Sequence, residues 1–145
     1  MPTGRWAVFD TSVYISAIRG GLGSLAYERL SSRLPRTYLA SVVSAELRAG
    51  ATNEGARRLV DHFTRWAHRV GRMVTPSAAT WERAGDILGK VRVSEARHRS
   101  KLPTLWNDLL IALSARQIGA TLVAENVQDF ELLRRHVRFD LEVVS

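Results

Sequence analysis

The stretch "RWAVFDTSVYIS", residues 5–16, decides the fold of this chain. An apolar run rich in β-forming residues ends at Asp10, two hydroxyl residues follow, and a second apolar run begins at once. The first run predicts a buried strand, and the second predicts a helix that Ser12 caps. Asp10 therefore falls at the carboxyl end of a strand, which is the edge where α/β proteins bind their ligands.

Strand and helix patterns alternate along the rest of the chain. Further strands are expected at "TYLA" (37–40), "RMVTP" (72–76), "ATLVA" (120–124) and "LEVVS" (141–145). Helical patterns lie between them at 24–34, 41–51, 53–70, 77–96, 104–117 and 128–136. This alternation predicts a single α/β domain over residues 1–145, with a mainly parallel sheet that helices cover on both faces.

Several local details follow from the same patterns. Ser41 and Ser77 are the expected caps of the helices that begin beside them. The helix at 53–70 is expected to bury one apolar stripe, formed by Leu59, Phe63, Trp66 and Val70. The segment "RHRSKLP" (97–103) is expected to be a basic loop. The histidines have no ligand spacing with one another and are expected at the surface: His62, His68, His98 and His136.

The composition excludes several kinds of chemistry. The chain has 145 residues and no cysteine, so disulfides, zinc–thiolate sites and thiol catalysis are ruled out. The first ten residues lack the charged-then-apolar layout of a signal peptide. No apolar run approaches the roughly 18 residues that a membrane helix needs. We expect a cytoplasmic protein that makes no membrane contact.

The charge balance points to an anionic partner. The chain carries 21 Lys and Arg against 14 Asp and Glu, which gives a formal charge of +7. A basic surface attracts polyanions and is the usual electrostatic footprint of nucleic-acid binding. An acidic protein partner would suit the same charge. So would a general preference for arginine, since 19 of the 21 basic residues are Arg.

Two further acids occupy positions that face the core. Glu46 shares a helical stripe with Val42, Val43 and small residues, where an unpaired charge would be costly. Its alternative role is an ion pair with Arg48 or with an arginine of another helix. Asp108 shares a stripe with Ile111 and Ala112. A favourable interaction with the helix N-terminus would account for it without catalysis. Asn107 or Thr104 could serve as the cap instead, which leaves Asp108 less necessary in that role.

The stretch "LVAENVQDF" adds two acids after the fourth strand. Glu125 and Asp129 are each open to the simpler role of a turn residue or an N-terminal helix cap. Carboxylates that converge at one point repel each other, so their pKa values rise unless a cation is present. Oxygen-only ligands suit Mg²⁺ or Mn²⁺. On a basic protein, such a site favours phosphoryl chemistry.

The order of these motifs resembles one known family. The segments "VFDTSVYI", "SVVSAELRAGA", "TPSAATWERAGDIL" and "NDLLIALSARQIGATLVAENVQDFELL" are similar to the PIN-domain ribonucleases, and most of all to the VapC-type toxins of bacterial toxin–antitoxin pairs. The resemblance covers nearly the whole chain. It implies a PIN-like three-layer α/β/α sandwich and an Mg²⁺- or Mn²⁺-dependent endoribonuclease that leaves a 5′-phosphate and a 3′-hydroxyl. It also implies an antitoxin partner and a homodimer.

The resemblance assigns roles to individual residues. It carries Asp10, Glu46 and Asp108 into the metal site and Asp129 into the fourth acidic position. Thr11 and Ser12 match the hydroxyl residues beside the first acid and would orient it or a water molecule. The family usually has a hydroxyl residue where this chain has Ala124. Glu125 stays open as the alternative fourth acid.

Substrate contacts and competing functions remain as hypotheses. Arg97, Arg99 and Lys101 flank the Asp108 motif and are candidates for phosphate contacts with RNA. Phosphatases with a nucleophilic aspartate need a second Asp two residues later, where this chain has Ser12. A phosphate-binding loop is excluded, since no Gly-Lys-Ser/Thr follows "GGLG". The remaining alternative is a non-catalytic RNA-binding or partner-binding module on the same fold.

Overall fold

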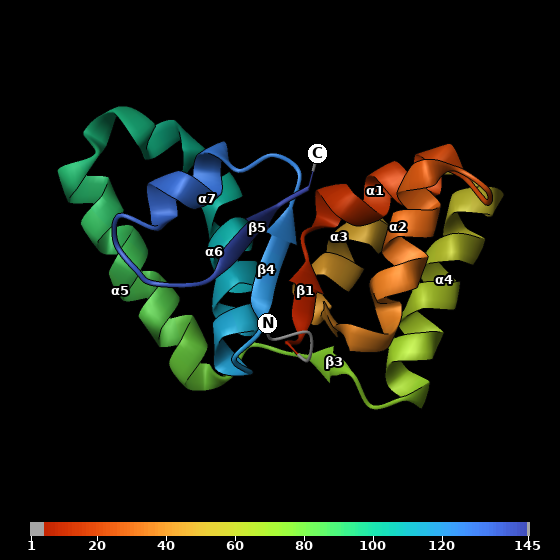
Figure 1. Cartoon of the computed structure of the whole chain (residues 1–145). Helices are drawn as coiled ribbons and strands as arrows, with labels where there is room; N and C mark the ends of the chain where they lie inside the picture. Colours follow the sequence, from red (N-terminus) through yellow and green to blue (C-terminus); the bar gives the residue numbers. More distant parts are fainter. Residues whose placement is uncertain (1–4, 145) are drawn as a thin grey trace.

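The computed structural model describes residues 5–144, and a five-stranded parallel sheet forms its centre (Figure 1). The strands lie in the order β3-β2-β1-β4-β5. They are β1 (Ala7–Phe9), β2 (Thr37–Ala40), β3 (Met73–Val74), β4 (Thr121–Ala124) and β5 (Leu141–Val143). Each of these strands lies within a segment that the sequence predicts to be one. Ser145, the end of the last predicted strand, lies outside the described residues.

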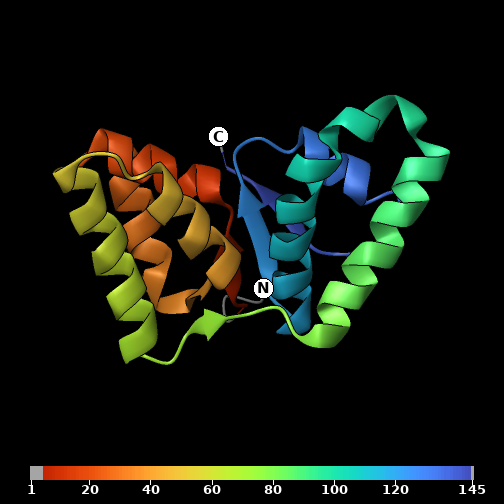
Figure 2. The same ribbon diagram turned by 180° about the vertical axis from the view of Figure 1, so that it is seen from behind.

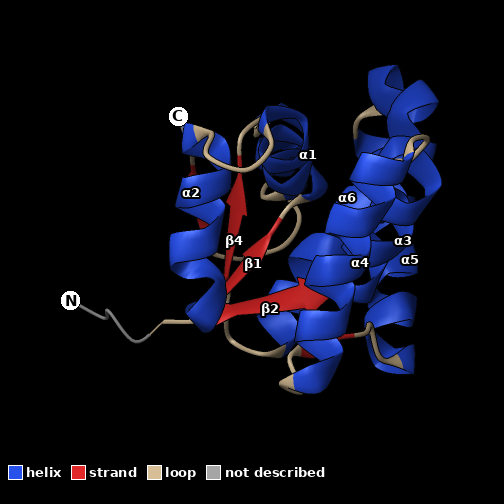
Figure 3. Cartoon of the chain, turned by 90° about the vertical axis from the view of Figure 1, so that its right-hand side faces the viewer, coloured by secondary structure: helices blue, strands red, loops and turns tan. Residues whose placement is uncertain are grey.

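Helices cover both faces of this sheet. They are α1 (Thr11–Gly20), α2 (Leu25–Arg33), α3 (Ser41–Gly50), α4 (Glu54–Arg69), α5 (Ala78–Ser94), α6 (Leu102–Gln117) and α7 (Gln128–Leu133), with short 3-10 helices η1 (Leu34–Arg36) and η2 (Ala96–Lys101). Figure 3 shows α2 on one side of the strands and α3, α5 and α6 on the other, with α1 at the strand ends. Seen from behind, α6 lies alongside β4 (Figure 2). The expected α/β/α sandwich is therefore confirmed.

The strand order creates a switch point beside β1. The chain leaves β1 for β2 and β3 on one side and later returns to β4 and β5 on the other. The Asp10 N–H donates to the Val123 carbonyl over 2.8 Å, so the ends of β1 and β4 are joined. Crevices at such points, outside the carboxyl ends of the strands, are where open parallel sheets bind ligands.

Apolar packing holds this edge rigid. Val8 and Leu122, neighbours in β1 and β4, are fully buried. The ring of Phe9 meets Tyr14 of α1 edge-on, and Tyr14 meets Phe63 of α4 in the same way. Dense packing of this kind fixes side chains in single rotamers. The strand that carries Asp10 therefore cannot shift without disturbing two helices.

The predicted stripe of α4 is only partly right. Phe63 is buried, and Leu59 and Trp66 pack at the edge of the core. Val70 is 42% exposed, because α4 ends at Arg69 and the chain turns away there. Val60 is buried in its place.

Helix starts differ from the sequence prediction in three places. Asp10, and not Ser12, caps α1, because the Asp10 carboxylate accepts from the Ser12 backbone. Ser41 is the first residue of α3, after Ala40 at the cap position. The predicted basic loop is the 3-10 helix η2, since α6 begins early at Leu102 with a proline in its first turn. Ser77 caps α5 as predicted.

No helix among residues 5–144 is both long and apolar enough to cross a bilayer.

An arginine is clamped between two tryptophans beside β1. The Arg72 guanidinium lies 5.2 Å from the ring centre of Trp6 and 5.0 Å from that of Trp66. One of its terminal nitrogens donates to the Pro35 carbonyl, whereas its buried Nε has no hydrogen-bond partner among the described residues. The two ring contacts and the charged hydrogen bond together join η1, α4 and the start of β1.

We expect Arg72→Met to lower the free energy of unfolding by about 1–3 kcal/mol, because two cation–π contacts and one hydrogen bond are lost. Urea denaturation followed by tryptophan fluorescence and by circular dichroism measures the change. Arg69→Met, at an exposed position of α4, is the matched control. Equal stability of the two variants would contradict the role given to Arg72.

Candidate active site

Asp10 occupies the switch point as a buried carboxylate. It follows β1 directly, caps α1, and is only 8% exposed as a residue. The Ser12 hydroxyl donates to Asp10 Oδ2 over 2.8 Å. Burial raises the pKa of Asp10, hydrogen bonds from Ser12 and Thr11 oppose the rise, and the nearby charge of Glu46 adds to it. Asp10 is thus a carboxylate held in place beside another negative charge.

Glu46 is fixed through both of its carboxylate oxygens. The Thr11 hydroxyl donates to Oε1 over 2.6 Å, and the Asn107 amide donates to Oε2 over 3.1 Å. These donors come from α1 and α6, so Glu46 on α3 lies between the two helices. The suggested ion pair with Arg48 is absent among the described residues, because Arg48 pairs with Asp61 instead.

Asp108 has the most perturbed carboxyl group of the site. Its pKa rises from 3.8 to about 7, first through burial and then through the charges of Asp10, Asp129 and Glu46. The structure therefore brings four predicted acids, from four different helices or helix starts, within electrostatic reach of one another. The helix-start role suggested for Asp108 is wrong, because α6 begins six residues earlier and neither Thr104 nor Asn107 caps it.

Asp129 lies in the first turn of α7 and makes an ion pair. Val127 stands at the cap position of α7, so Asp129 is not the cap that its sequence position suggests. Lys101 Nζ lies 3.2 Å from Asp129 Oδ1, with the two side chains 40% and 27% exposed. A cation from η2 thus lies at the edge of the acidic cluster.

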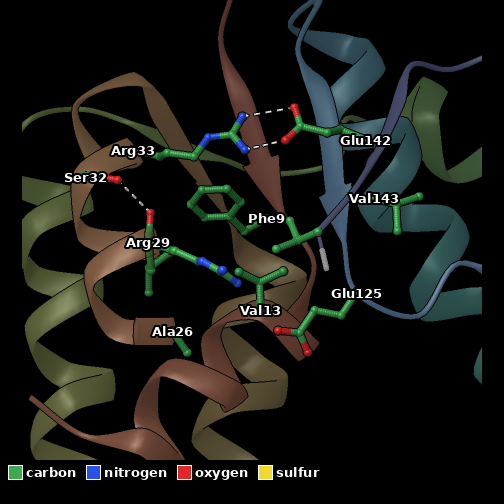
Figure 4. Close-up of a pocket in the computed structure, with 11 residues that line it drawn as sticks. Phe9, Val13, Ala26, Arg29, Ser32, Arg33, Glu125, Glu142 and Val143 are labelled. Atoms are coloured by element: carbon green, nitrogen blue, oxygen red, sulfur yellow. Dashed lines mark hydrogen bonds and ion pairs between the residues drawn. The ribbon is translucent and has the colours of Figure 1, made fainter. Parts of the chain in front are cut away.

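Glu125 belongs to a different cavity. Its side chain is exposed and accepts a hydrogen bond from Ser16 of α1 over 2.8 Å. It lines a cavity of about 330 Å³ between α1, α2 and β5, where Arg33 and Glu142 form a two-pronged ion pair (Figure 4). The structure does not bring Glu125 into the group that surrounds Asp108.

The donor chemistry of the four-acid group fits a hard divalent cation. Oxygen ligands and the absence of cysteine suit Mg²⁺ or Mn²⁺. Burial and then three like charges raise the pKa of Asp108. Within residues 5–144, however, no three carboxylate or imidazole side chains are already placed as a ligand set for one ion. The shared metal site stays a prediction.

The basic segment beside the site is ordered by a cluster that the sequence did not suggest. Arg97 and Arg99 are exposed on η2. Glu95, just before η2, pairs with Arg135 and lies 2.6 Å from His136 Nε2. His136 is therefore not a surface residue, since its side chain is 14% exposed.

The sequence does not predict the role of Asn107 in the site. Its pattern suggests Asn107 only as a cap, yet Asn107 holds Glu46, and its place beside Asp108 is the available signal. Lys101 is among the predicted RNA contacts, but no local pattern links it to Asp129, 28 residues away.

Comparisons with known proteins agree with this fold. The sequence model of the PIN-domain family matches residues 7–135 of the chain. A comparison with curated protein sequences found no match.

Solved structures share the fold over almost the whole chain. DNA-bound VapBC from Salmonella typhimurium superimposes with a TM-score of 0.67 at 21% identity, covering 96% of this chain and 98% of that one. VapBC2 from Rickettsia felis, bound to a DNA fragment from its promoter, superimposes with a TM-score of 0.63 at 22% identity and covers the same shares of the two chains. VapBC-1 from nontypeable Haemophilus influenzae superimposes with a TM-score of 0.65 at 21% identity, covering 94% of this chain and 96% of that one.

The raised pKa of Asp108 predicts a pH-dependent stability in the absence of metal. The folded protein keeps this proton up to about pH 7, whereas the unfolded chain loses it near 3.8, so stability falls as pH rises between these values. Asp108→Asn removes the free-energy cost of ionising Asp108 in the folded protein. The pKa change sets a ceiling of about 4 kcal/mol, and partial solvent access reduces the expected gain at pH 8 to about 1–2 kcal/mol.

Urea denaturation in the presence of a chelator, at pH 5 and pH 8, measures this gain. The stabilisation by Asp108→Asn should be larger at pH 8 than at pH 5. Asp86→Asn, at an exposed position of α5, is the control and should change little at either pH. A gain for Asp108→Asn that does not depend on pH would show that Asp108 is not electrostatically stressed.

Proposed function

The chain belongs to the PIN-domain family, and on that premise we propose that it is a metal-dependent endoribonuclease and the VapC-type toxin of a toxin–antitoxin pair. PIN domains are generally nucleases, so hydrolysis of phosphodiester bonds is the function that the fold supports best. The observation that carries the proposal is that Asp108 is buried beside three other acids: burial, and then the charges of Asp10, Asp129 and Glu46, raise its pKa. Acids gathered at a buried edge are costly for folding and are expected where a cation is used.

Three of these acids would hold the metal. Asp10, Glu46 and Asp108 come from the end of β1, from α3 and from α6, and together they line the switch point. When bound, Mg²⁺ or Mn²⁺ would activate a water molecule and offset the charge that builds on the phosphate. Thr11 and Asn107 hold the Glu46 carboxylate, and Ser12 holds that of Asp10. These donors keep two of the ligands oriented before substrate arrives.

The basic surface would bring the substrate to this site. The net charge of +7 favours a polyanion, and η2 presents Arg97, Arg99 and Lys101 next to the start of α6. Contacts with phosphates fix the position of a nucleic acid without reading its sequence. RNA, rather than DNA, is proposed on the family resemblance.

The proposed partner is an antitoxin protein. The similar solved structures are named as VapBC complexes, two of them with DNA. By analogy, this chain would be the nuclease subunit of such a pair, inhibited by its partner. We also propose that the chain forms a homodimer and acts in the cytoplasm, without membrane contact.

Cleavage of RNA by the purified protein tests the proposal. We expect cleavage with Mg²⁺ or Mn²⁺, products that carry a 5′-phosphate, and a loss of at least about 100-fold in rate for Asp10→Asn. Asparagine can still cap α1, so the variant should stay folded. Sequencing the 5′ ends of the products identifies the bond. RNA binding without cleavage in either metal would favour a non-catalytic binding module instead.

A comparison of the two acids after β4 tests the composition of the site. Asp129→Asn should reduce the RNase activity strongly, because Asp129 lies within electrostatic reach of Asp108. Glu125→Gln should reduce it less, because Glu125 lines the separate cavity beside Ser16. Both variants should be assayed with Mg²⁺ and with Mn²⁺, because a tighter-binding metal can hide a lost ligand. A larger loss for Glu125→Gln in both metals would reverse the assignment.

A further inference from the structure

Lys101 is a cation built into the edge of the acidic group. Its Nζ lies 3.2 Å from Asp129 Oδ1, and Asp129 is one of the three charges that raise the pKa of Asp108. The Lys101 side chain is 40% exposed, so its ammonium group can still meet a ligand from solvent. Lys101 therefore lies between the carboxylates and the bulk solvent.

The position of Lys101 follows from the geometry of α6. Lys101 stands at the cap position of this helix, seven residues before Asp108. Seven residues of an α-helix rise roughly 10 Å, so Lys101 lies about that distance from Asp108 along the axis of α6. The partial positive charge of the helix N-terminus adds to that of Lys101. This end of α6 is suited to an anion that reaches toward Asp108.

The stability of the fold does not explain the Lys101–Asp129 pair. Ion pairs as exposed as this one contribute about 0–1 kcal/mol, because water screens them and two flexible side chains lose freedom. Asp129 is also not needed as a helix cap, since Val127 occupies that position. The contact does, however, restrict a flexible lysine to one location. The pair therefore fits a role in positioning better than a role in folding.

We propose that Lys101 is a phosphate-binding residue of the active site, and that Asp129 acts by holding Lys101 there and not by binding the metal. The proposal rests on the nuclease function proposed above and refines its substrate contacts. Lys101 would bind a phosphate oxygen of the RNA chain beside the bond that is cut. The metal would then have three protein carboxylates as ligands: Asp10, Glu46 and Asp108.

Binding of Mn²⁺ to the protein alone separates the two roles of Asp129. If Asp129 only positions Lys101, Asp129→Asn should change the Mn²⁺ dissociation constant by less than about fivefold, the effect of removing one nearby charge. Asp108→Asn should weaken Mn²⁺ binding much more. Titration followed by electron paramagnetic resonance measures free Mn²⁺. If Asp129→Asn weakens Mn²⁺ binding tenfold or more, whether or not Lys101→Met is also present, Asp129 is a metal ligand and the proposal is overturned.

RNA binding tests Lys101 itself. In the Asp10→Asn variant, which is not expected to cleave RNA, adding Lys101→Met should weaken RNA binding about tenfold. It should also reduce the salt slope, log affinity against log salt, by about 0.7, as expected for one lost phosphate contact on a single strand. Lys90→Met is the matched control, because Lys90 is the other lysine of the chain and lies exposed on α5. Equal effects of Lys101→Met and Lys90→Met would overturn the proposal.

A double-mutant cycle on RNA cleavage completes the test. Lys101→Met and Asp129→Asn should each raise KM, and the double variant should be no worse than Lys101→Met alone, because Asp129 would act through Lys101. Lys101→Arg should restore most of the affinity. Additive losses would contradict the proposal. If the wild-type protein cleaves no RNA, the nuclease function fails, whereas a wild-type nuclease that is insensitive to Lys101→Met leaves that function standing and removes only this inference.

Discussion

Repulsion between the carboxylates gathered beside the end of β1 is the constraint to which the surrounding hydrogen bonds respond. Asp10 is buried there because it follows a central strand, and Glu46 and Asp108 arrive on helices that pack beside it. Burial and like charge both favour the protonated forms, which explains why the pKa of Asp108 rises to about 7. A fold with no use for a cation would gain stability by replacing these acids with neutral side chains.

The chain counters this repulsion with donors from neighbouring elements. Ser12 donates to Asp10 from the same helix start, and Thr11 and Asn107 donate to Glu46 from α1 and α6. Lys101 supplies a full charge at the edge. Hydrogen bonds to charged groups are worth about 1.5–3 kcal/mol each, enough to hold a carboxylate in one orientation but not to neutralise the group. The site is thus oriented while it remains negative.

Sequence patterns predict the strands and the unusual acids because both depend on local burial. A short apolar run that ends in an acid marks β1 and Asp10, and an acid on an apolar helical face marks Glu46. Contacts between distant segments leave no such pattern: Thr11 meets Glu46 across 35 positions, and Asn107 meets it across 61. Predictions of where helices start fail for a related reason. Asp10 and Ser12 are both good caps, and tertiary packing decides between them.

Contacts at both of its ends explain why η2 can hold a lysine at a fixed place. The three basic side chains of η2 repel one another, and contact with α6 alone would not offset this repulsion. Glu95, just before η2, pairs with residues of the segment after α7 and so fixes the start of η2. The hydrogen bond from His136, followed by the charges of Arg135 and His136, lowers the pKa of Glu95, so this carboxylate stays ionised. Lys101 at the other end of η2 meets Asp129 at the start of α7. Ion pairs at both ends of η2 therefore join it to α7 and to the segment after α7, and the position of Lys101 beside Asp129 depends on them.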